Sequence, residues 1–368
     1  MQTIISEKNA YNAIEGVLRG LSVKKYLLVC DAAFRFLCIR DYFDTFDIPH
    51  VVFSGFTSNP LYEDVCHGVD LFRGEKCDAI VAVGGGSAID VAKCIKLYCK
   101  MDPARNYLKQ EMADSGVPLI AVPTTAGTGS ESTRHAVIYF EGVKQSISHD
   151  SIVPNFAVLD ARLLATLPIY QKKCTMMDAL CQGIESWWSV HSTEESKIYS
   201  ATAVQTIMRY GDAYLKDNDK EAAAHVLLAA NFAGRAINIT QTTAAHAMSY
   251  KLTSLYGLPH GHAVAVCLPP LWDYMIGHPT PCIDPRGIDY VQGIFAGIAA
   301  ALGCADSAAA VRKLRGMLRD LELKAPAIKE EDLPLLAASV HPTRLKNNPI
   351  APTGEALLDL YKRVRDGN

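Results

Sequence analysis

Three features are missing from this sequence: a long hydrophobic run, a basic tract and a closely spaced cysteine pair. No stretch of about 18 apolar residues occurs, so we expect no transmembrane helix. The first ten residues include Glu7 and Lys8 and lack the apolar core of a secretion signal, so we expect a cytoplasmic protein. With a net charge of −3 and no basic run, the chain lacks the electrostatic footprint of a nucleic-acid-binding protein. We therefore expect neither nucleic-acid nor membrane partners.

The 11 cysteines follow no C-x-x-C spacing, which argues against a zinc ribbon or a thioredoxin-like redox motif. Their odd number in a long chain also argues against a disulfide framework. Cys30, Cys94, Cys99 and Cys267 lie within apolar runs, where cysteine behaves as a small hydrophobic residue. We expect free thiols.

The first half of the chain alternates short apolar runs with helical patterns, which predicts parallel strands connected by helices. This order fits a doubly wound α/β sheet. The expected strands are Tyr26–Cys30, His50–Phe53, Ala79–Val83, Pro118–Val122, Ala136–Phe140 and Phe156–Leu159, and the expected helices are Ala33–Phe46, Tyr62–Arg73 and Ser87–Lys100.

Beyond Leu167 and Pro168 the pattern changes to long segments rich in alanine and leucine, with the helical period of about 3.6 residues. Such segments cover 172–190, 195–216 and 220–239, without a convincing strand. We expect an α/β domain over residues 1–167 and an all-helical domain over residues 168–368. Because no flexible linker separates them, we expect a tight cleft between the domains, which is the usual place for a small-molecule site.

A glycine-rich turn, Gly84-Gly85-Gly86-Ser87, follows the expected strand Ala79–Val83 and opens a helical pattern. Glycines let backbone N–H groups approach a ligand, and a helix N-terminus favours an anion. Ser87 and Asp90 also form an N-cap pattern. The turn is neither a GxGxxG fingerprint nor a Walker loop. It predicts a phosphate cradle, with a ligand-free turn as the alternative.

A second loop, residues 123–131 (PTTAGTGSE), follows the fourth expected strand and combines hydroxyl groups with glycines. Such groups at the carboxyl end of a doubly wound sheet can bind phosphate and ribose. Asp31, at the end of the first expected strand, can accept hydrogen bonds from a ribose diol and would repel a 2′-phosphate. This favours NAD over NADP, although an aspartate at a strand end can also be a simple cap.

One acid and two histidines in the second half, Asp178, His246 and His260, form a candidate metal site. A carboxylate and two imidazoles suit Fe²⁺ or Zn²⁺, and three protein ligands leave a position open for a substrate oxygen. In a chain with 11 histidines and 39 acidic residues, such a set can also arise by chance. The candidate therefore depends on its context.

The GGGSAID turn, the PTTAGTGSE loop, Asp178 and the two-histidine segment occur in the order found in the iron-containing (group III) metal-dependent alcohol dehydrogenases, and the chain resembles that family along essentially its whole length. The resemblance implies the dehydroquinate synthase-like fold, in which an α/β dinucleotide-binding domain accompanies a helical metal domain. It implies NAD(H) and one divalent metal (Fe²⁺, Zn²⁺ or Mn²⁺) as cofactors, interconversion of aldehydes and alcohols, and a homodimer.

The resemblance also assigns residues to the two sites. The implied metal ligands are Asp178, His246 and His260, with Gln182 in a fourth position. The implied cofactor-binding residues are Asp31, Gly84, Gly85, Gly86, Ser87, Asp90, Thr124, Thr125, Thr128, Ser130 and Lys144.

The sequence departs from the family pattern at two positions. Members usually carry a histidine where this chain has Gln182, and many carry one where it has Tyr250. Gln182 can offer its carbonyl oxygen as a weaker ligand. Related glycerol dehydrogenases manage with one acid and two histidines, whereas maleylacetate reductases work without a catalytic metal. The resemblance therefore leaves the metal content open.

In the implied reaction, hydride moves from NADH to a carbonyl carbon, and a divalent cation stabilises the negative charge on oxygen. The oxygen then takes up a proton, for which metal-bound water, Tyr250 and His262 are candidates. The expected catalytic residues are His260, His262 and Tyr250.

Cationic residues predict that the substrate is a short anionic aldehyde. Arg134 and His135 directly follow the second loop, and Lys346 lies in a stretch that lines the pocket in the family. Arginine can bind a sulfonate or phosphonate through paired hydrogen bonds. The chain is also similar to the hydroxyethylphosphonate dehydrogenase and sulfoacetaldehyde reductase-like branch, which implies reduction of phosphonoacetaldehyde or sulfoacetaldehyde. Uncharged short aldehydes are the alternative.

Two other functions compete with this one. A cyclase similar to 3-dehydroquinate synthase would share the fold and cofactors, but the PTTAGTGSE loop favours a dehydrogenase. A non-catalytic NAD-binding relative with a decayed metal site is the other alternative, and Gln182 keeps it open.

Overall fold

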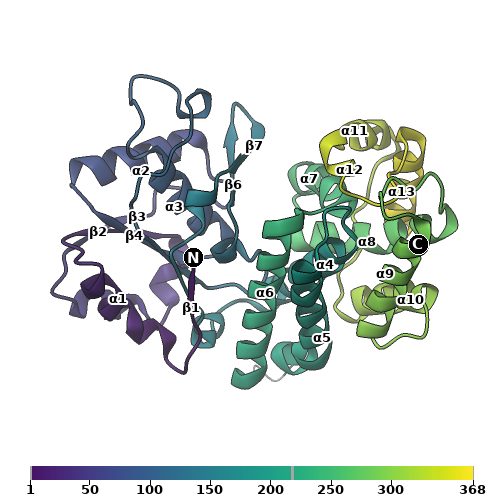
Figure 1. Ribbon diagram of the computed structural model, residues 1–368, viewed down its shortest axis with the longest axis horizontal. Helices are drawn as coiled ribbons and strands as arrows, with labels where there is room; N and C mark the ends of the chain where they lie inside the picture. Colours follow the sequence, from purple (N-terminus) through teal and green to yellow (C-terminus); the bar gives the residue numbers. More distant parts are fainter. Residues whose placement is uncertain (1, 217–218, 368) are drawn as a thin grey trace. The chain divides into compact units, whose positions relative to one another are not determined.

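The computed structural model describes residues 2–216 and 219–367, and the chain divides into two compact units between Leu167 and Pro168 (Figure 1). The strands belong to the first unit and the long helices to the second. The predicted fold class, a parallel α/β sheet followed by a helical part, is confirmed.

A six-stranded parallel sheet with the order β1-β8-β5-β4-β2-β3 is the centre of the first unit. Its central strands β2, β4 and β5 are buried along their whole length, as expected of parallel strands covered on both faces. Alternate residues enter two separate cores: Leu27 packs in one, and Leu28 packs in the other. The strands are β1 (Thr3–Ile5), β2 (Tyr26–Cys30), β3 (His50–Phe53), β4 (Ala79–Gly84), β5 (Leu119–Pro123) and β8 (Phe156–Val158).

Two of the three expected helices of this unit are confirmed as α2 (Tyr62–Gly74) and α3 (Gly86–Tyr98), and a short helix, α1 (Ile14–Gly20), precedes them. The expected helix Ala33–Phe46 is wrong. Two 3-10 helices, Ala32–Phe36 and Arg40–Thr45, stand in its place, with an extended Leu37 after the first. This segment has clustered aromatic side chains instead of one apolar stripe, and its rings pack against one another: Phe34, Tyr42, Phe43 and Phe46.

Two strands were not predicted from the sequence. The edge strand β1 has only three residues, too few to show an alternating pattern. The other is β7 (Val143–Ser148), which forms an antiparallel hairpin with the expected strand β6 (His135–Phe140). The hairpin turns at Glu141 and Gly142, both with positive φ (51° and 73°). Two such residues are typical of a tight hairpin turn. The hairpin places Lys144 opposite Tyr139.

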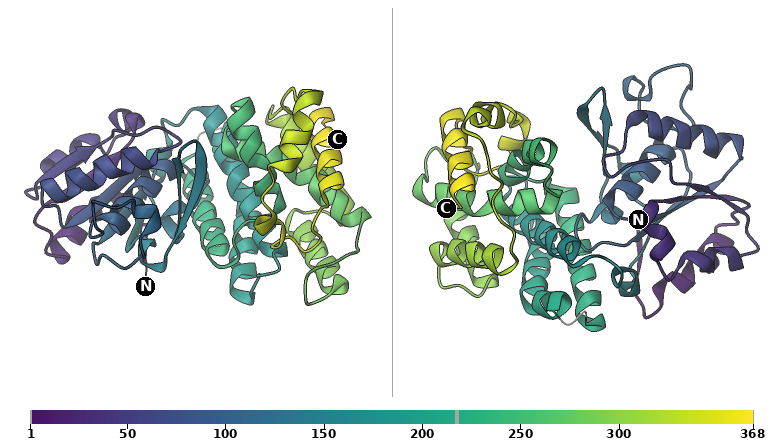
Figure 2. Two further views of the ribbon diagram at one scale, coloured as in Figure 1. Left: turned by 90° about the horizontal axis from the view of Figure 1, so that it is seen from above. Right: turned by 180° about the vertical axis from the view of Figure 1, so that it is seen from behind.

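The described part of the second unit consists of helices joined by loops, as Figure 2 shows from two further sides. The three expected long helices are confirmed with ends shifted by a few residues. Among the described residues, every helix is too short or too polar to cross a bilayer. The helices are α4 (Ile169–Trp188), α5 (Glu194–Lys216), α6 (Lys220–Thr240), α7 (Ala244–Tyr256), α8 (His260–Gly277), α9 (Ile288–Ala301), α10 (Ser307–Asp320), α11 (Leu333–Ala338), α12 (Pro342–Leu345) and α13 (Gly354–Asp366).

Candidate metal and cofactor sites

Three helices of the second unit bring Asp178, His246 and His260 together. Asp178 lies on α4, His246 on the first turn of α7, and His260 is the first residue of α8. One potential ligand atom from each of the three lies within 4.8 Å of the others. Oδ1 of Asp178 is 3.4 Å from Nε2 of His246 and 3.9 Å from Nε2 of His260. This grouping is what a shared metal ion requires.

The close packing of α8 against α4 depends on Gly261. A Cβ atom at this position would lie 2.1 Å from the backbone oxygen of Cys174 and 2.8 Å from Cβ of Asp178. Only glycine therefore allows the two helices to approach this closely. Because Gly261 follows His260 directly, this contact sets the distance between His260 and Asp178.

Glu185, which sequence reasoning missed, orients His246. Its Oε2 lies within hydrogen-bond distance of Nδ1 of His246, and its Oε1 accepts hydrogen bonds from the backbone N–H groups of Thr243 (3.1 Å) and Ala245 (3.0 Å). The fully buried carboxylate thus caps α7 and leaves Nε2 of His246 for a ligand. The signal that could have found it is its spacing from Asp178, seven residues and two helical turns along α4.

The group is strongly negative, which suits a cation. Burial alone would lower the pKa of His246, but the charges of Glu185 and Asp178 raise it to about 10. Two carboxylates therefore act on one buried imidazole. A divalent cation placed here would be attracted by the same charges.

Three buried polar atoms in this group make no hydrogen bond to any described residue: Oδ1 of Asp178, Oε1 of Gln182 and Nε2 of His246. Buried polar groups are nearly always satisfied, so atoms like these need an explanation. Gln182 lies one turn after Asp178 on α4, where its carbonyl oxygen can join the set. Unsatisfied oxygen and nitrogen acceptors beside a half-exposed His260 fit a bound metal ion.

The two other expected catalytic residues have different surroundings. The ring of Tyr250 stacks on that of His260, with centroids 6.0 Å apart. His262 is buried, and both of its ring nitrogens are engaged: Nε2 donates to the backbone oxygen of Lys324 (2.9 Å), which leaves Nδ1 to accept from the hydroxyl of Tyr170 (2.9 Å). Burial lowers the pKa of His262. These contacts hold His262 in place as a neutral ring.

In the first unit, the direction of strand addition reverses between β2 and β4. The strand β3, which follows β2 in the chain, pairs with one edge of β2, and the next strand, β4, pairs with the other edge. Asp31 follows β2, and Gly84 ends β4. A Cβ atom on Gly84 would lie 3.1 Å from Oδ2 of Asp31. Doubly wound sheets bind their ligands at such a switch point. Oδ1 of Asp31 also caps the following 3-10 helix by accepting from the N–H of Ala33 (2.9 Å).

The second loop lies against the glycine-rich turn. A Cβ on Gly86 would lie 2.9 Å from Cγ2 of Thr128, and one on Gly85 would lie 3.4 Å from Cγ2 of Thr125. The N–H of Thr124 donates to the backbone oxygen of Gly84 (3.0 Å). Both loops therefore form one continuous surface at the N-terminus of α3, a location that favours phosphate.

The predicted N-cap is wrong. Gly85 occupies the N-cap position of α3 without a side-chain cap, and Ser87 donates its hydroxyl hydrogen to the backbone oxygen of Ser58 (2.5 Å). The carboxylate of Asp90 accepts from the Ser130 hydroxyl (2.6 Å) and the Val137 N–H (2.9 Å). The helix begins at Gly86, earlier than expected, so Ser87 lies inside its first turn and cannot be the N-cap. Asp90 ties the second loop and the hairpin to α3.

Lys93 is a second residue missed by sequence reasoning. It is fully buried, and its Nζ donates to the hydroxyls of Ser130 and Thr133 (3.0 Å each) and to the backbone oxygen of His135 (2.7 Å). Burial lowers its pKa to about 8, against the opposing charges of Asp90 and Glu131. Lys93 thus fixes the segment between the second loop and β6.

The residues expected to bind the substrate belong to both units. In the first unit, Arg134 pairs with Asp150 (2.9 Å), and Nδ1 of His135 lies 3.0 Å from the hydroxyl of Ser148. In the second unit, Lys346 is exposed. The neighbouring Arg344 donates to Oε1 of Gln241 (2.9 Å).

Arg344 places a cation at the connection between α6 and α7. Gln241 ends α6, and Thr243 is the N-cap residue of α7, whose first turn carries His246. The residues between these helices are also held by Asn347, whose side chain donates to the backbone oxygen of Thr242 (3.1 Å). The segment around Arg344 is therefore tied to the connection that leads into α7, the helix that carries His246.

A parallel sheet with two glycine-rich loops at its switch point, followed by a helical unit with an Asp-His-His group, defines the class of dinucleotide-dependent, metal-assisted oxidoreductases. Residues 2–161 match the family described as iron-containing alcohol dehydrogenase, and residues 173–365 match the C-terminal part of the same family. The chain belongs to the iron-containing alcohol dehydrogenases. The family works with NAD(H) and a divalent metal ion.

Several known proteins are similar to this chain. Phosphonoacetaldehyde reductase from Streptomyces viridochromogenes is 35% identical over 75% of this chain and 73% of its own. 1,3-Propanediol dehydrogenase from Klebsiella pneumoniae is 32% identical over 89% of this chain and 88% of its own. The crystal structure of sulfoacetaldehyde reductase from Bifidobacterium kashiwanohense in complex with NAD⁺ has a TM-score of 0.89 at 27% identity, over 100% of this chain and 98% of that one. This chain is an oxidoreductase that reduces aldehydes with NADH.

Proposed function

We propose that this enzyme reduces a short aldehyde with an anionic head group, either sulfoacetaldehyde to isethionate or phosphonoacetaldehyde to 2-hydroxyethylphosphonate. The observation that carries the proposal is Arg344, a cation that donates to Gln241, the C-cap residue of α6, two residues before the N-cap of α7, the helix that bears His246. Similarity to a phosphonoacetaldehyde reductase and a sulfoacetaldehyde reductase supports it. A neutral short aldehyde, as the similarity to a 1,3-propanediol dehydrogenase would suggest, is the second candidate.

The proposed metal ligands are Asp178, His246 and His260, with Gln182 as a weaker fourth. A bound divalent ion supplies Lewis-acid stabilisation of the negative charge on the substrate oxygen, while NADH supplies the hydride. Glu185 and Gly261 act through the ligands: Glu185 orients the ring of His246, and Gly261 allows His260 to approach Asp178.

The proposed cofactor site is the surface formed by the two glycine-rich loops. The pyrophosphate would lie at the N-terminus of α3, bound by backbone N–H groups of Gly85 and Gly86 and by nearby threonine hydroxyls. Asp31 would accept hydrogen bonds from the ribose diol, which favours NAD. The other proposed contacts of the cofactor are Ser87, Asp90, Ser130 and Lys144.

Tyr250 is the residue we propose for proton transfer to the substrate oxygen. Its ring stacks on the proposed ligand His260, and it is only partly buried, so a proton can reach it from solvent. His262 was an equal candidate in the sequence, but its Nε2–H is already donated to a backbone oxygen and its other nitrogen accepts from Tyr170. We therefore give His262 a role in positioning α8.

The guanidinium of arginine can donate two parallel hydrogen bonds to two oxygen atoms of a sulfonate or phosphonate. We propose Arg344, Arg134, His135 and Lys346 as the residues that recognise the anionic head. Of these, Arg344 has its position fixed by Gln241, whereas Lys346 is exposed. We expect Arg344 to contribute more to specificity than Lys346.

NADH oxidation measured with phosphonoacetaldehyde, sulfoacetaldehyde, succinic semialdehyde and butanal, each with Fe²⁺, Zn²⁺ and Mn²⁺, tests the proposal. We expect the highest kcat/KM with one of the two aldehydes that carry a phosphonate or sulfonate. In Arg344→Ala, loss of a charge-assisted hydrogen bond should raise KM for that aldehyde roughly 10- to 100-fold and leave KM for butanal nearly unchanged.

Lys346→Ala and Arg134→Ala, assayed alongside, rank the other cations, and Arg312→Ala on α10 is an exposed control. Butanal as the best substrate, with equal effects of Arg344→Ala on charged and neutral aldehydes, would assign the enzyme to neutral substrates. NAD⁺ reduction and reoxidation without net NADH consumption would instead indicate a cyclase.

Replacing Glu185 with glutamine tests the orientation of His246. The amide keeps the shape of the side chain but removes the negative charge that faces the imidazole of His246. We therefore expect metal affinity to fall roughly 10- to 100-fold. Equilibrium titration of the metal-free protein with Zn²⁺ measures this change, and Glu355→Gln, an exposed glutamate on α13, serves as control. Unchanged Zn²⁺ affinity in Glu185→Gln would show that Glu185 has only a capping role.

A further inference from the structure

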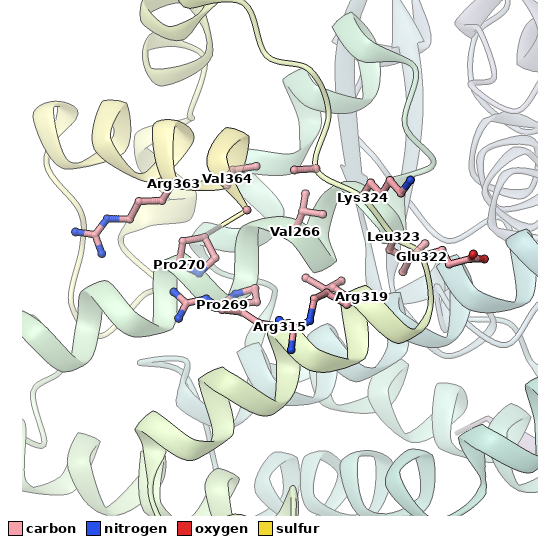
Figure 3. Close-up of a pocket in the computed structure, with 13 residues that line it drawn as sticks. Val266, Pro269, Pro270, Arg315, Arg319, Glu322, Leu323, Lys324, Arg363 and Val364 are labelled. Atoms are coloured by element: carbon pink, nitrogen blue, oxygen red, sulfur yellow. The ribbon is translucent and has the colours of Figure 1, made fainter.

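A pocket in the second unit lies apart from the metal-ligand group, between α8, α10 and α13 (Figure 3). Its volume is about 350 Å³, which is within the range of small-molecule sites. The turn that follows α10 closes one side with Leu323, Lys324 and Ala325. The pocket is therefore built by residues of one unit.

The inner surface of this pocket is apolar. Val266, Pro269 and Pro270 of α8, Leu318 of α10 and Val364 of α13 line it. Adjacent prolines lack N–H groups, so this part of α8 offers no backbone donors to a polar ligand. An alkyl chain is what such a surface binds best, because its burial removes apolar area from water.

The rim of the same pocket is cationic. Four lining residues are basic, Arg315, Arg319, Lys324 and Arg363, and one, Glu322, is acidic. Glu322 pairs with Lys173 (3.3 Å). Figure 3 shows Arg315 and Arg319 on α10, close to Pro269 in this view. The charge of the rim therefore favours an anion.

Two of these cations share one carboxylate. Arg315 lies 3.6 Å and Arg363 3.4 Å from Oδ2 of Asp273. Within the described part of the chain, Nε of Arg315 is buried without a hydrogen-bond partner, and no ion pair is formed by Arg319 or Lys324. A buried guanidinium N–H without an acceptor is costly. An anionic group in the pocket would supply that acceptor.

We propose that this pocket binds a ligand with an anionic head group on an alkyl chain, with the head at Arg315 and Arg319 and the chain over Val266, Pro269 and Pro270. None of the three proposed metal ligands lines the pocket, and Val266 and Pro269 lie roughly 120° and 180° around α8 from His260, at about 100° per residue. The site is thus separate from the metal-ligand group.

The experiment is calorimetric titration of the metal-loaded enzyme with octanoate and with octyl phosphate, which share the chain and differ in the head group. We expect saturable binding of at least one of them with Kd below about 1 mM. Acetate lacks the chain and 1-octanol lacks the charge, so both should bind at least tenfold more weakly. The tighter of the two anions identifies the source of the head group.

The variant Arg315→Ala/Arg319→Ala should weaken binding by roughly 10- to 100-fold, because each arginine contributes a charge-assisted hydrogen bond. Arg312→Ala, on the same helix but outside the pocket, should bind as the unaltered protein does. Basal aldehyde reduction and the far-ultraviolet circular dichroism spectrum should stay unchanged in both, which shows that the variants fold.

Four results would overturn the proposal. Octanol that binds as tightly as octanoate would remove the role of the arginines. Equal affinities of Arg315→Ala/Arg319→Ala and Arg312→Ala for the anion would show that the anion binds outside this pocket. Loss of anion binding in His260→Ala would place the anion at the proposed metal site. Absence of saturable binding by both anions would show that the pocket is a surface crevice.

Discussion

Replacing His260 with alanine is expected to remove tight metal binding and to lower kcat by about 1,000-fold or more. The imidazole of His260 is one of the three proposed metal ligands, and its Nε2 lies 3.9 Å from Oδ1 of Asp178. Lewis-acid stabilisation of a developing oxyanion contributes several kcal/mol, and each 1.36 kcal/mol corresponds to a factor of ten in rate. Metal content by elemental analysis and NADH-dependent turnover measure the two effects.

His278→Ala is the matched control, because His278 is an exposed histidine at the other end of the same helix, with Nδ1 held by the backbone oxygen of Tyr274 (3.0 Å). It should retain the metal and full turnover. If a metal-depleted His260→Ala protein were as active as the unaltered enzyme, the metal would have no part in catalysis. The chain would then be comparable to a metal-independent reductase.

The strands of the sheet were predictable because each is a continuous apolar run, such as Tyr26–Cys30, that ends at a turn residue. The sequence indicated the candidate metal site by residue type and by the order of motifs. The structure brings its three residues together: Asp178, His246 and His260. The failure at Ala33–Phe46 has a different cause: many of its apolar residues are aromatic, and contacts between their rings, which a sequence pattern does not report, decided its shape.

The residues that position the ligands could not be predicted in the same way. Glu185 acts through His246, which is 61 residues away in the sequence, and nothing local indicates that contact. Lys93 resembles any lysine on an amphipathic helix until the fold buries it beneath Ser130. Such roles depend on tertiary distances, whereas the sequence pattern reports only neighbours along one element.

Gly261 is the clearest case, and it carries the second large prediction. In Gly261→Ala the new methyl group would meet the backbone oxygen of Cys174 at 2.1 Å, so α8 must move away from α4. We expect the free energy of unfolding to fall by about 1–3 kcal/mol, the usual cost of an overpacked contact. Because the shift separates His260 from Asp178, we also expect metal affinity to fall at least about tenfold.

Gly277→Ala is the control on the same helix, since no atom lies within 4 Å of the position its Cβ would take. It should leave metal affinity unchanged and stability equal or slightly higher, because alanine favours the helical state. Chemical denaturation and Zn²⁺ titration of both variants separate the two effects of Gly261. If Gly261→Ala lost stability but kept its Zn²⁺ affinity, the approach of α8 to α4 would serve folding alone, and the position of His260 would be set by α7.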